Sequence, residues 1–480
     1  MNEIYHLILL VFIQFIGFLL LSIFKIDGRL RVWLGFLAGL LVINQALILN
    51  LFILDRVSVL LFFVLIFTFC VAIIYFKKTF LISNFDFNYL KYDIVFLFGL
   101  MCIVVLKPSY IGVSADSVHY YVAADAINNN VLTADLLKKF SWFFVSGRLI
   151  ALNSFIIFGL FVDVDLIIYI LPLTGFVSLM FIFRLITLKY KPVYIQQIII
   201  FFLITIFSLS IDRFLSHTHY LHSNLITGSF YLIGVLLLVH GNGDAFGTKN
   251  PYLAIIFLAA TMLVRKEMIL FSLIPVLLYL VFNKHKLIQS VRYVLFYLLL
   301  GYQWIGYYIY KTVDIEISFD DFFYSGHGKV QDYVFGIFIT VLMSVVALLI
   351  KNTLSKAYLN KLIYIVYFLM LLTLFLVDFQ ETVSTILKLF YFSIVKISAW
   401  GFYWFVLSLA LFYSISHRIN IFICHVIISF MVLRIGIYVM YDSITDYGGG
   451  DRMLLLIFLI GVYLIFNVIQ YDIKIVRKKR

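Results

Sequence analysis

The sequence predicts an all-α protein, a polytopic bundle of transmembrane helices that is embedded along almost its whole length. Three observations support this prediction. The 480 residues are 64% hydrophobic and only 12% charged, whereas soluble proteins carry roughly 45–50% apolar and about 25% charged residues. The mean hydropathy is +1.09. The apolar residues also fall into runs close to the ~20 residues that a helix needs to cross a bilayer.

The first apolar run, Tyr5 to Phe24, has the length of a spanning helix. We interpret it as a retained helix rather than a signal peptide, because no basic leader precedes it and no small-residue cleavage site follows it. The predicted spans are 5–24, 32–54, 57–76, 90–107, 165–187, 193–211, 223–240, 252–264, 268–283, 293–311, 333–351, 361–377, 398–416, 419–440 and 453–471.

Loop charge predicts the orientation of these spans. If the basic tail, residues 474–480, is cytoplasmic, most of the Lys and Arg residues fall on that side, as the positive-inside rule requires. The result is about 15 crossings with the N-terminus outside. The segment from Phe143 to Phe161 is apolar enough to cross, but a crossing there would invert every later loop. We therefore expect it to be interfacial or re-entrant, packed against protein or a cavity.

Composition also limits the function classes. The net charge of +12 does not indicate nucleic-acid binding, because a polytopic membrane protein collects Lys and Arg in its cytoplasmic loops. Three cysteines, Cys70, Cys102 and Cys424, lie inside apolar runs and show neither a disulfide framework nor zinc spacing. We predict two parts: three N-terminal transmembrane helices in residues 1–89, and a transmembrane module in residues 90–480 with an external loop at 108–148.

The loop after the fourth span carries the first polar feature. After Asp116, the residues Tyr120, Ala123, Ala124 and Ile127 recur at three- and four-residue spacing, which predicts an amphipathic helix along the membrane surface. Asp116 stands at its start. It is therefore either a helix cap or a functional carboxylate, and the residues alone leave both readings open.

A histidine-rich loop runs from Ser210 to Asn224. In this loop His219 and His222 would share one face of a helix. Imidazole is a common metal ligand. None of the usual zinc spacings is present, however. Hydrogen bonding at a wet interface is the favoured interpretation of these histidines.

Two further features each contain an arginine. Asp451-Arg452 follows three glycines and stands at the mouth of the last span. It is either a capping pair or a phosphate-binding arginine, since the guanidinium fork matches phosphate oxygens. Arg265-Lys-Glu267 separates two apolar runs, and a structural Arg265–Glu267 pair is the alternative to a binding role. The predicted topology places all four polar features on the external side.

The order of these features resembles the GT-C glycosyltransferases. Asp116-Ser-Val-His-Tyr120 is similar to the acidic motif that this family carries in its first long external loop. Arg265-Lys-Glu267 is similar to a mid-chain pair of an Arg and an acidic residue, with one residue inserted. Gly450-Asp451-Arg452-Met-Leu is similar to a late motif that precedes a span. Three spans precede the one leading into the Asp116 loop, where familiar members have one.

The resemblance implies a function and roles for these residues. A GT-C enzyme moves a sugar from a polyprenyl-phosphate-linked donor to a glycan, lipid or protein acceptor on the non-cytoplasmic face of the cell membrane, here with inversion expected. Asp116 would be the general base, and Arg452 and Arg265 would clamp the lipid phosphate. The supporting substrate-binding residues would be Asp451, Tyr120, Glu267, His219 and His222. Some members use Mg²⁺ or Mn²⁺, for which Asp116 and Asp125 are the candidate ligands.

Two alternative functions stay open. A cell-surface polysaccharide polymerase or ligase would use the same lipid-linked donors with longer glycans. A lipid-linked oligosaccharide flippase or transporter would place ionisable residues near the bilayer midplane, often with repeat symmetry. The sequence shows no repeat, and Arg434 is its only clear charge inside a predicted span. These two observations favour an enzyme.

Overall fold

The computed structural model describes most of the apolar part of the chain. The described residues are 2–24, 26, 28–54, 57–83, 90–105, 167–218, 223–240, 251–265, 268–283, 287–303, 346, 349, 356–391, 397–441 and 454–479. Within these residues the regular structure is entirely helical, and no strand occurs. The all-α prediction is therefore confirmed for the described part of the chain.

The helices follow the apolar runs of the sequence. In chain order they are α1 (Asn2–Ile23), α2 (Gly28–Leu54), α3 (Val59–Ser83), α4 (Leu90–Val105), α9 (Ile167–Tyr190), α10 (Tyr194–Leu209), α11 (Asp212–His217), α12 (Asn224–His240), α13 (Tyr252–Val264), α14 (Met268–Phe282), α15 (Leu287–Gly301), α19 (Lys356–Val377), α20 (Phe379–Phe390), α21 (Ile397–Trp400), α22 (Tyr403–Ser416), α23 (Ile421–Tyr441) and α25 (Leu455–Lys479).

Several of these helices are long and apolar enough to cross a membrane. Within the described part of the chain there are five such segments, at Ile4–Ile23, Leu30–Leu54, Ile168–Tyr190, Tyr358–Val377 and Leu455–Ile475. Other apolar helices, α12 and α13 among them, are shorter. The chain therefore carries the helices of a membrane protein. The count of about 15 spans stays a prediction.

Two differences from the sequence-based prediction change how the chain is divided into helices. The span predicted over 398–416 is divided into α21 and α22, because Gly401 adopts φ +52°, a left-handed conformation that glycine takes without strain. The amphipathic helix α20 was not predicted. Asp378 caps it by accepting a hydrogen bond from the Glu381 N–H at 2.8 Å. One face of α20 is buried at Thr382, Thr385 and Leu389.

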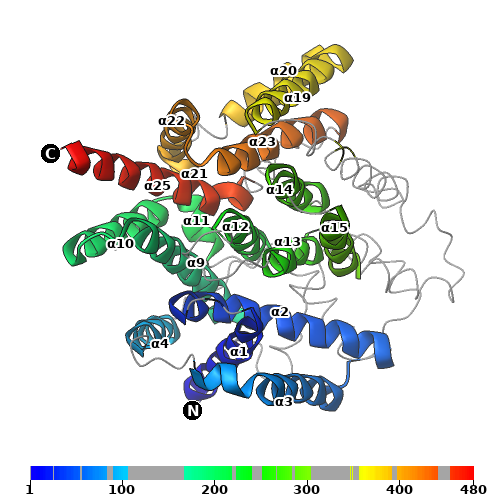
Figure 1. The fold of residues 1–480 in the computed structure, drawn as a ribbon, viewed down its shortest axis with the longest axis vertical. Coiled ribbons are helices and arrows are strands. Elements are labelled where there is room, and N and C mark those ends of the chain that lie inside the picture. Colours follow the sequence, from blue (N-terminus) through cyan, green and yellow to red (C-terminus); the bar gives the residue numbers. More distant parts are fainter. Residues whose placement is uncertain are drawn as a thin grey trace, which may run out of the picture.

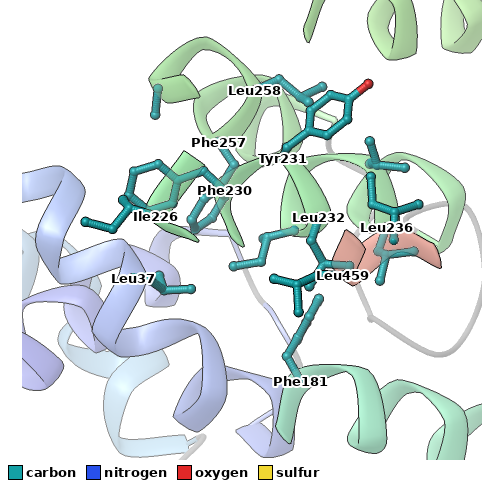
Figure 2. Close-up of a cluster of buried hydrophobic side chains, with 14 of the residues drawn as sticks. Leu37, Phe181, Ile226, Phe230, Tyr231, Leu232, Leu236, Phe257, Leu258 and Leu459 are labelled. Atoms are coloured by element: carbon teal, nitrogen blue, oxygen red, sulfur yellow. The ribbon is translucent and has the colours of Figure 1, made fainter. Parts of the chain in front are cut away.

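The helix α12 lies near the centre of the bundle, with α1–α4 on one side and α19 and α20 on the other (Figure 1). Every residue of α12 from Asn224 to Leu238 is buried, as expected for a helix that is apolar all round. Figure 2 shows Leu37 of α2, Phe181 of α9 and Leu459 of α25 among the side chains gathered around it. The N-terminal helices therefore share one hydrophobic core with the rest of the described chain.

The helices α1 and α2 form a closely packed antiparallel pair. Gly17 of α1 lies against the backbone of Gly35 and Gly39, which are spaced four residues apart on α2. Small residues at this spacing let helix backbones approach closely, and such contacts drive helix association in membranes. The side chain of Gln14 donates a hydrogen bond to the Val32 carbonyl at 2.7 Å across the same contact.

The described contacts define two ends of the bundle. At one end, here called the Arg265 end, Arg265 meets Asn224, and Gly228 lies beside Leu455. At the other end, here called the Lys189 end, Lys189 meets Asn467 and His240 meets Tyr463. It follows that α9, α12 and α25 run in one direction and α13 in the opposite one. The predicted topology gives these four helices the same relative directions.

Candidate functional site

Arg265 stands at a break between two short helices. The helix α13 has 13 residues and α14 has 15, so neither reaches the ~20 residues of a full span. Arg265 follows α13 with an extended backbone, φ −145° and ψ 118°. Its N–H still donates to the Thr261 carbonyl at 2.8 Å. The backbone turn thus places one charged side chain where two apolar helices separate.

The guanidinium of Arg265 is buried against the start of α12. Only 3% of the residue is exposed. Its Nη1 donates hydrogen bonds to the side-chain oxygen of Asn224 and to the hydroxyl of Ser223, the latter at 3.5 Å. Both partners are themselves fully buried. Burying a charged group is expensive unless it is hydrogen-bonded. These two bonds therefore help to orient the guanidinium, and Ser223 and Asn224 are both neutral side chains.

The last helix begins close to this arginine. A Cβ on Gly228 would lie 3.1 Å from the Leu455 carbonyl oxygen, so the start of α25 packs against α12 about one turn beyond Asn224. The predicted motif Asp451-Arg452 precedes this start by a few residues in sequence. The described residues therefore bring Arg265 and the beginning of the last span to the same end of the bundle.

The histidine-rich loop also reaches the Arg265 end. Its first part forms the short helix α11, and the Phe214 ring there stacks on Phe458 of α25 at 5.2 Å. The side chain of Thr218 lies beside Gly175 of α9. His217 is buried, and its Nδ1 pairs with the Arg213 carbonyl oxygen at 2.7 Å. This histidine is buried and hydrogen-bonded to the backbone, and the interpretation of His219 and His222 stays a prediction.

Most of the predicted site residues lie outside the described residues. These are Asp116, Tyr120, Asp125, His219, His222, Glu267, Asp451 and Arg452, together with the segment 143–161. Their roles stay predictions, and so does the Arg265–Glu267 pair. The part of the chain that the structure describes contains no group of three or more His, Cys, Asp or Glu side chains able to hold a metal ion.

Sequence reasoning missed two residues that hydrogen-bond to Arg265. Ser223 and Asn224 lie about 40 positions before it in the chain, at the junction of a loop and an apolar run. A signal was present, because Ser and Asn are residues that favour the start of a helix. The pairing with Arg265 was not predictable, because periodicity reports which residues share a face and not which distant helix faces them.

A second polar cluster lies at the opposite, Lys189 end. Lys189 Nζ donates to Asn467 Oδ1 at 3.1 Å, and the Tyr190 hydroxyl also bonds to Asn467. The Asn467 side chain donates to the Tyr463 hydroxyl, which pairs with His240 Nε2, both at 2.6 Å. The sequence analysis singled out nothing comparable on this side. Asn467, a lone polar residue inside an apolar run, was the available signal.

A third polar cluster surrounds His425 of α23. Its Nε2 pairs with the Asn360 side-chain oxygen at 3.1 Å, and the Tyr364 ring of α19 lies 4.8 Å away. The Tyr367 hydroxyl donates to the His425 carbonyl at 3.2 Å. The Phe282 ring stacks on the imidazole at 5.8 Å. Polar side chains thus lie inside the bundle at several positions besides Arg434, which was the only charged residue that the sequence placed clearly inside a span.

An apolar cavity of about 250 Å³ lies between the N-terminal helices and the middle of the chain. Its walls come from α1, α2 and α3 on one side and from α13 and α15 on the other. On α13 the lining residues are Ile256, Ala260 and Leu263, which follow one face of the helix toward the Arg265 end. Gln45 is the one polar residue among those lining it. The cavity therefore suits a hydrocarbon chain.

Comparison with known proteins finds no relative of this chain. The chain matches no protein-family model, no curated protein and no solved structure.

Proposed function

We propose that this chain is a membrane glycosyltransferase that moves a sugar from a polyprenyl-phosphate-linked donor to a glycan, lipid or protein acceptor on the non-cytoplasmic face. One observation carries the proposal. The buried guanidinium of Arg265 is oriented by Ser223 and Asn224 at a break between two short helices. It lies at the end of the bundle where the last helix begins and where the histidine-rich loop packs.

The proposed chemistry is a direct displacement. Asp116 takes the proton of the acceptor hydroxyl, whose oxygen attacks the anomeric carbon of the donor sugar. The bond from that carbon to the phosphate oxygen breaks, and its electron pair leaves with the lipid phosphate. Arg265 and Arg452 stabilise this developing negative charge, because cations placed where charge develops lower the barrier. Attack from the side opposite the leaving group inverts the anomeric centre.

Two further observations support a lipid-linked donor. The described helices are those of a membrane protein, so the donor's hydrocarbon chain is accessible from the bilayer. The apolar cavity follows one face of α13 toward the level of Arg265. A chain lying there would keep its attached phosphate near the end of the bundle where the arginine stands. A divalent cation held by Asp116 and Asp125 would add Lewis-acid stabilisation of the same leaving group.

The direct test is sugar transfer by purified full-length protein in lipid nanodiscs. A panel of radiolabelled polyprenyl-phosphate sugars is supplied with membrane extracts as acceptor, and labelled product is counted with and without Mg²⁺ or Mn²⁺. We expect transfer from one donor by the wild type and much weaker transfer by Arg265→Lys. Arg184→Lys is the matched control. Arg184 is also buried, but it lies in the C-terminal half of α9, away from the Arg265 end. Absence of transfer from every donor would overturn the proposal.

A lipid-linked oligosaccharide flippase or transporter is the second candidate. The observation that favours it is the set of ionisable side chains buried inside helices, among them Arg31, Arg184, His425 and Arg434. Buried ionisable groups in membrane helices often mark transport pathways. A fluorescent lipid-linked oligosaccharide in proteoliposomes separates the two functions. Translocation without a new glycosidic bond supports the transporter, and a product lengthened by many sugars supports a polymerase or ligase.

A further inference from the structure

Two lysines approach one tyrosine ring at the Lys189 end. Lys189 Nζ lies 5.3 Å from the centre of the Tyr190 ring, and Lys474 Nζ lies 6.0 Å from the same centre. Two ammonium groups held this close repel each other. No carboxylate of the described residues pairs with either of them. The acid nearest to Lys474 in sequence, Asp472, accepts a hydrogen bond from the Tyr413 hydroxyl instead.

Lys189 is held in place by Asn467 of α25 and by Asn420, which directly precedes α23. Its Nζ donates to Asn467 Oδ1 at 3.1 Å and to Asn420 Oδ1 at 3.4 Å. Asn467 is fully buried and is fixed in turn by the Tyr463 hydroxyl at 2.6 Å. A long lysine side chain normally loses conformational freedom on binding a ligand. Here that loss is largely complete before any ligand arrives, so the site is preorganised.

The lysines stand beside an apolar surface. The helix α10 begins four residues after Tyr190, and its Ile195 and Phe202 side chains are exposed. Ile473, next to Lys474 on α25, is also exposed. The Phe207 ring of α10 packs on Phe466 of α25 at 5.8 Å, which joins the two helices into one surface. A pair of cations at one end of an exposed apolar face matches an anionic headgroup joined to hydrocarbon chains.

We infer that Lys189 and Lys474 bind the phosphate of an anionic phospholipid, whose acyl chains lie along the exposed faces of α10 and α25. The phosphate would contact both ammonium groups, which otherwise repel each other, beside the Tyr190 ring. Lysines near the membrane surface are attracted to anionic lipids. The apolar face selects a lipid over free phosphate, because only a lipid covers both parts of the surface. The inference does not depend on the proposed function.

The test uses full-length protein in neutral detergent. It is titrated with phosphatidylglycerol or phosphatidylcholine, and bound lipid is counted by native mass spectrometry. The wild type should prefer phosphatidylglycerol. Lys189→Gln and Lys474→Gln should each weaken its binding about fivefold. The double variant should lose more than either single variant but less than about 25-fold, because both lysines act on one phosphate. Lys388→Gln is the matched control, because Lys388 lies on α20, which packs against α19 and α23. It should bind like the wild type.

Further measurements separate a binding role from a structural one. Lys189→Arg keeps the charge and should retain the preference, even if Lys189→Gln lowers the melting temperature. Inorganic phosphate at the lipid's concentration should not displace phosphatidylglycerol. The inference would be overturned if the double variant kept the wild-type preference. It would also be overturned if Lys388→Gln lost as much binding as the double variant, or if free phosphate competed equally.

Discussion

The Arg265 guanidinium donates a hydrogen bond to the side-chain oxygen of Asn224, which joins the end of α13 to the beginning of α12. The two residues are 41 positions apart in the chain. Asn224 is neutral, so its amide oxygen orients the arginine without cancelling its positive charge. A carboxylate at the same position would orient the arginine and also cancel its positive charge. The pair therefore offers a way to separate a binding role of Arg265 from a structural one.

We predict that Asn224→Asp impairs donor binding while it preserves or raises stability. The new carboxylate would form a buried ion pair with Arg265 and compete with the donor phosphate for the guanidinium. A hydrogen bond to a charged group contributes about 1.5–3 kcal/mol, so donor affinity should fall about 10- to 100-fold. Donor affinity is measured by titration, and stability by thermal unfolding in detergent.

The control for that variant is Asn360→Asp. Asn360 also hydrogen-bonds across two helices, to His425, but it lies in a different cluster and should leave donor affinity unchanged. If Arg265 has only a structural role, Asn224→Asp should bind donor as well as the wild type. That result would remove Arg265 from the proposed phosphate site.

The sequence predicted much of the helical arrangement because membrane helices are set by local composition. The predicted spans 223–240, 252–264 and 268–283 agree with α12, α13 and α14 to within one residue at each boundary. These runs are continuously apolar and end at polar residues. The helix α20 was missed because its apolar residues alternate with Thr, Ser and Gln. A composition test for spans does not detect such a surface helix.

The candidate site was less predictable than the helices. Arg265 was identified from its charge between two apolar runs. Its partner Asn224, and the contact between Lys189 and Asn467 across 278 positions, depend on which helices become neighbours. Periodicity gives the face of a helix, but it does not give the identity of the helix that packs against that face.

We predict that Gly39→Ala destabilises the protein, whereas Gly436→Ala does not. A Cβ on Gly39 would collide with the Ile13 carbonyl and lie 2.9 Å from the Ile13 Cγ2, so α1 and α2 would have to separate. Overpacking of this kind costs roughly 1–3 kcal/mol. Among the described residues, a Cβ on Gly436 would meet only the Leu374 side chain, at 3.7 Å.

The measurement for this pair is the melting temperature of each variant in the same detergent. Gly436→Ala is the control for Gly39→Ala. Both positions lie within helices, where alanine is more favourable than glycine, so the two variants differ in the collision at Gly39. Equal melting temperatures for the two variants would show that the close approach of α1 and α2 contributes little to stability.

We predict that Asp116→Asn leaves the protein expressed and inserted but lowers turnover by about 10²-fold or more, the usual contribution of a general base. Asparagine keeps the shape and the capping ability of the side chain but cannot accept a proton. Steady-state transfer rates with saturating donor give the comparison, and Asp125→Asn tests the second candidate metal ligand in parallel. Normal turnover of Asp116→Asn would make Asp116 a helix cap.

The last prediction concerns Arg452, which lies outside the described residues, a few positions before the beginning of α25. If Arg452 clamps the donor phosphate, Arg452→Lys should be a poor replacement, because lysine keeps the charge but loses the two-pronged guanidinium. The loss of a charged hydrogen bond corresponds to roughly 1.5–3 kcal/mol. Donor affinity should therefore fall about 10- to 100-fold.

A structural Asp451–Arg452 pair gives a different result. Exposed ion pairs contribute only ~0–1 kcal/mol, so lysine would then serve almost as well as arginine. Donor affinity and turnover of Arg452→Lys and Arg452→Ala are compared with those of Arg265→Lys. If both arginines hold one phosphate, the double variant Arg265→Lys/Arg452→Lys should lose less than the product of the two single losses, because residues acting on one group are not additive. Near-wild-type donor binding by both Arg452 variants would exclude the clamp and leave the pair as a helix cap.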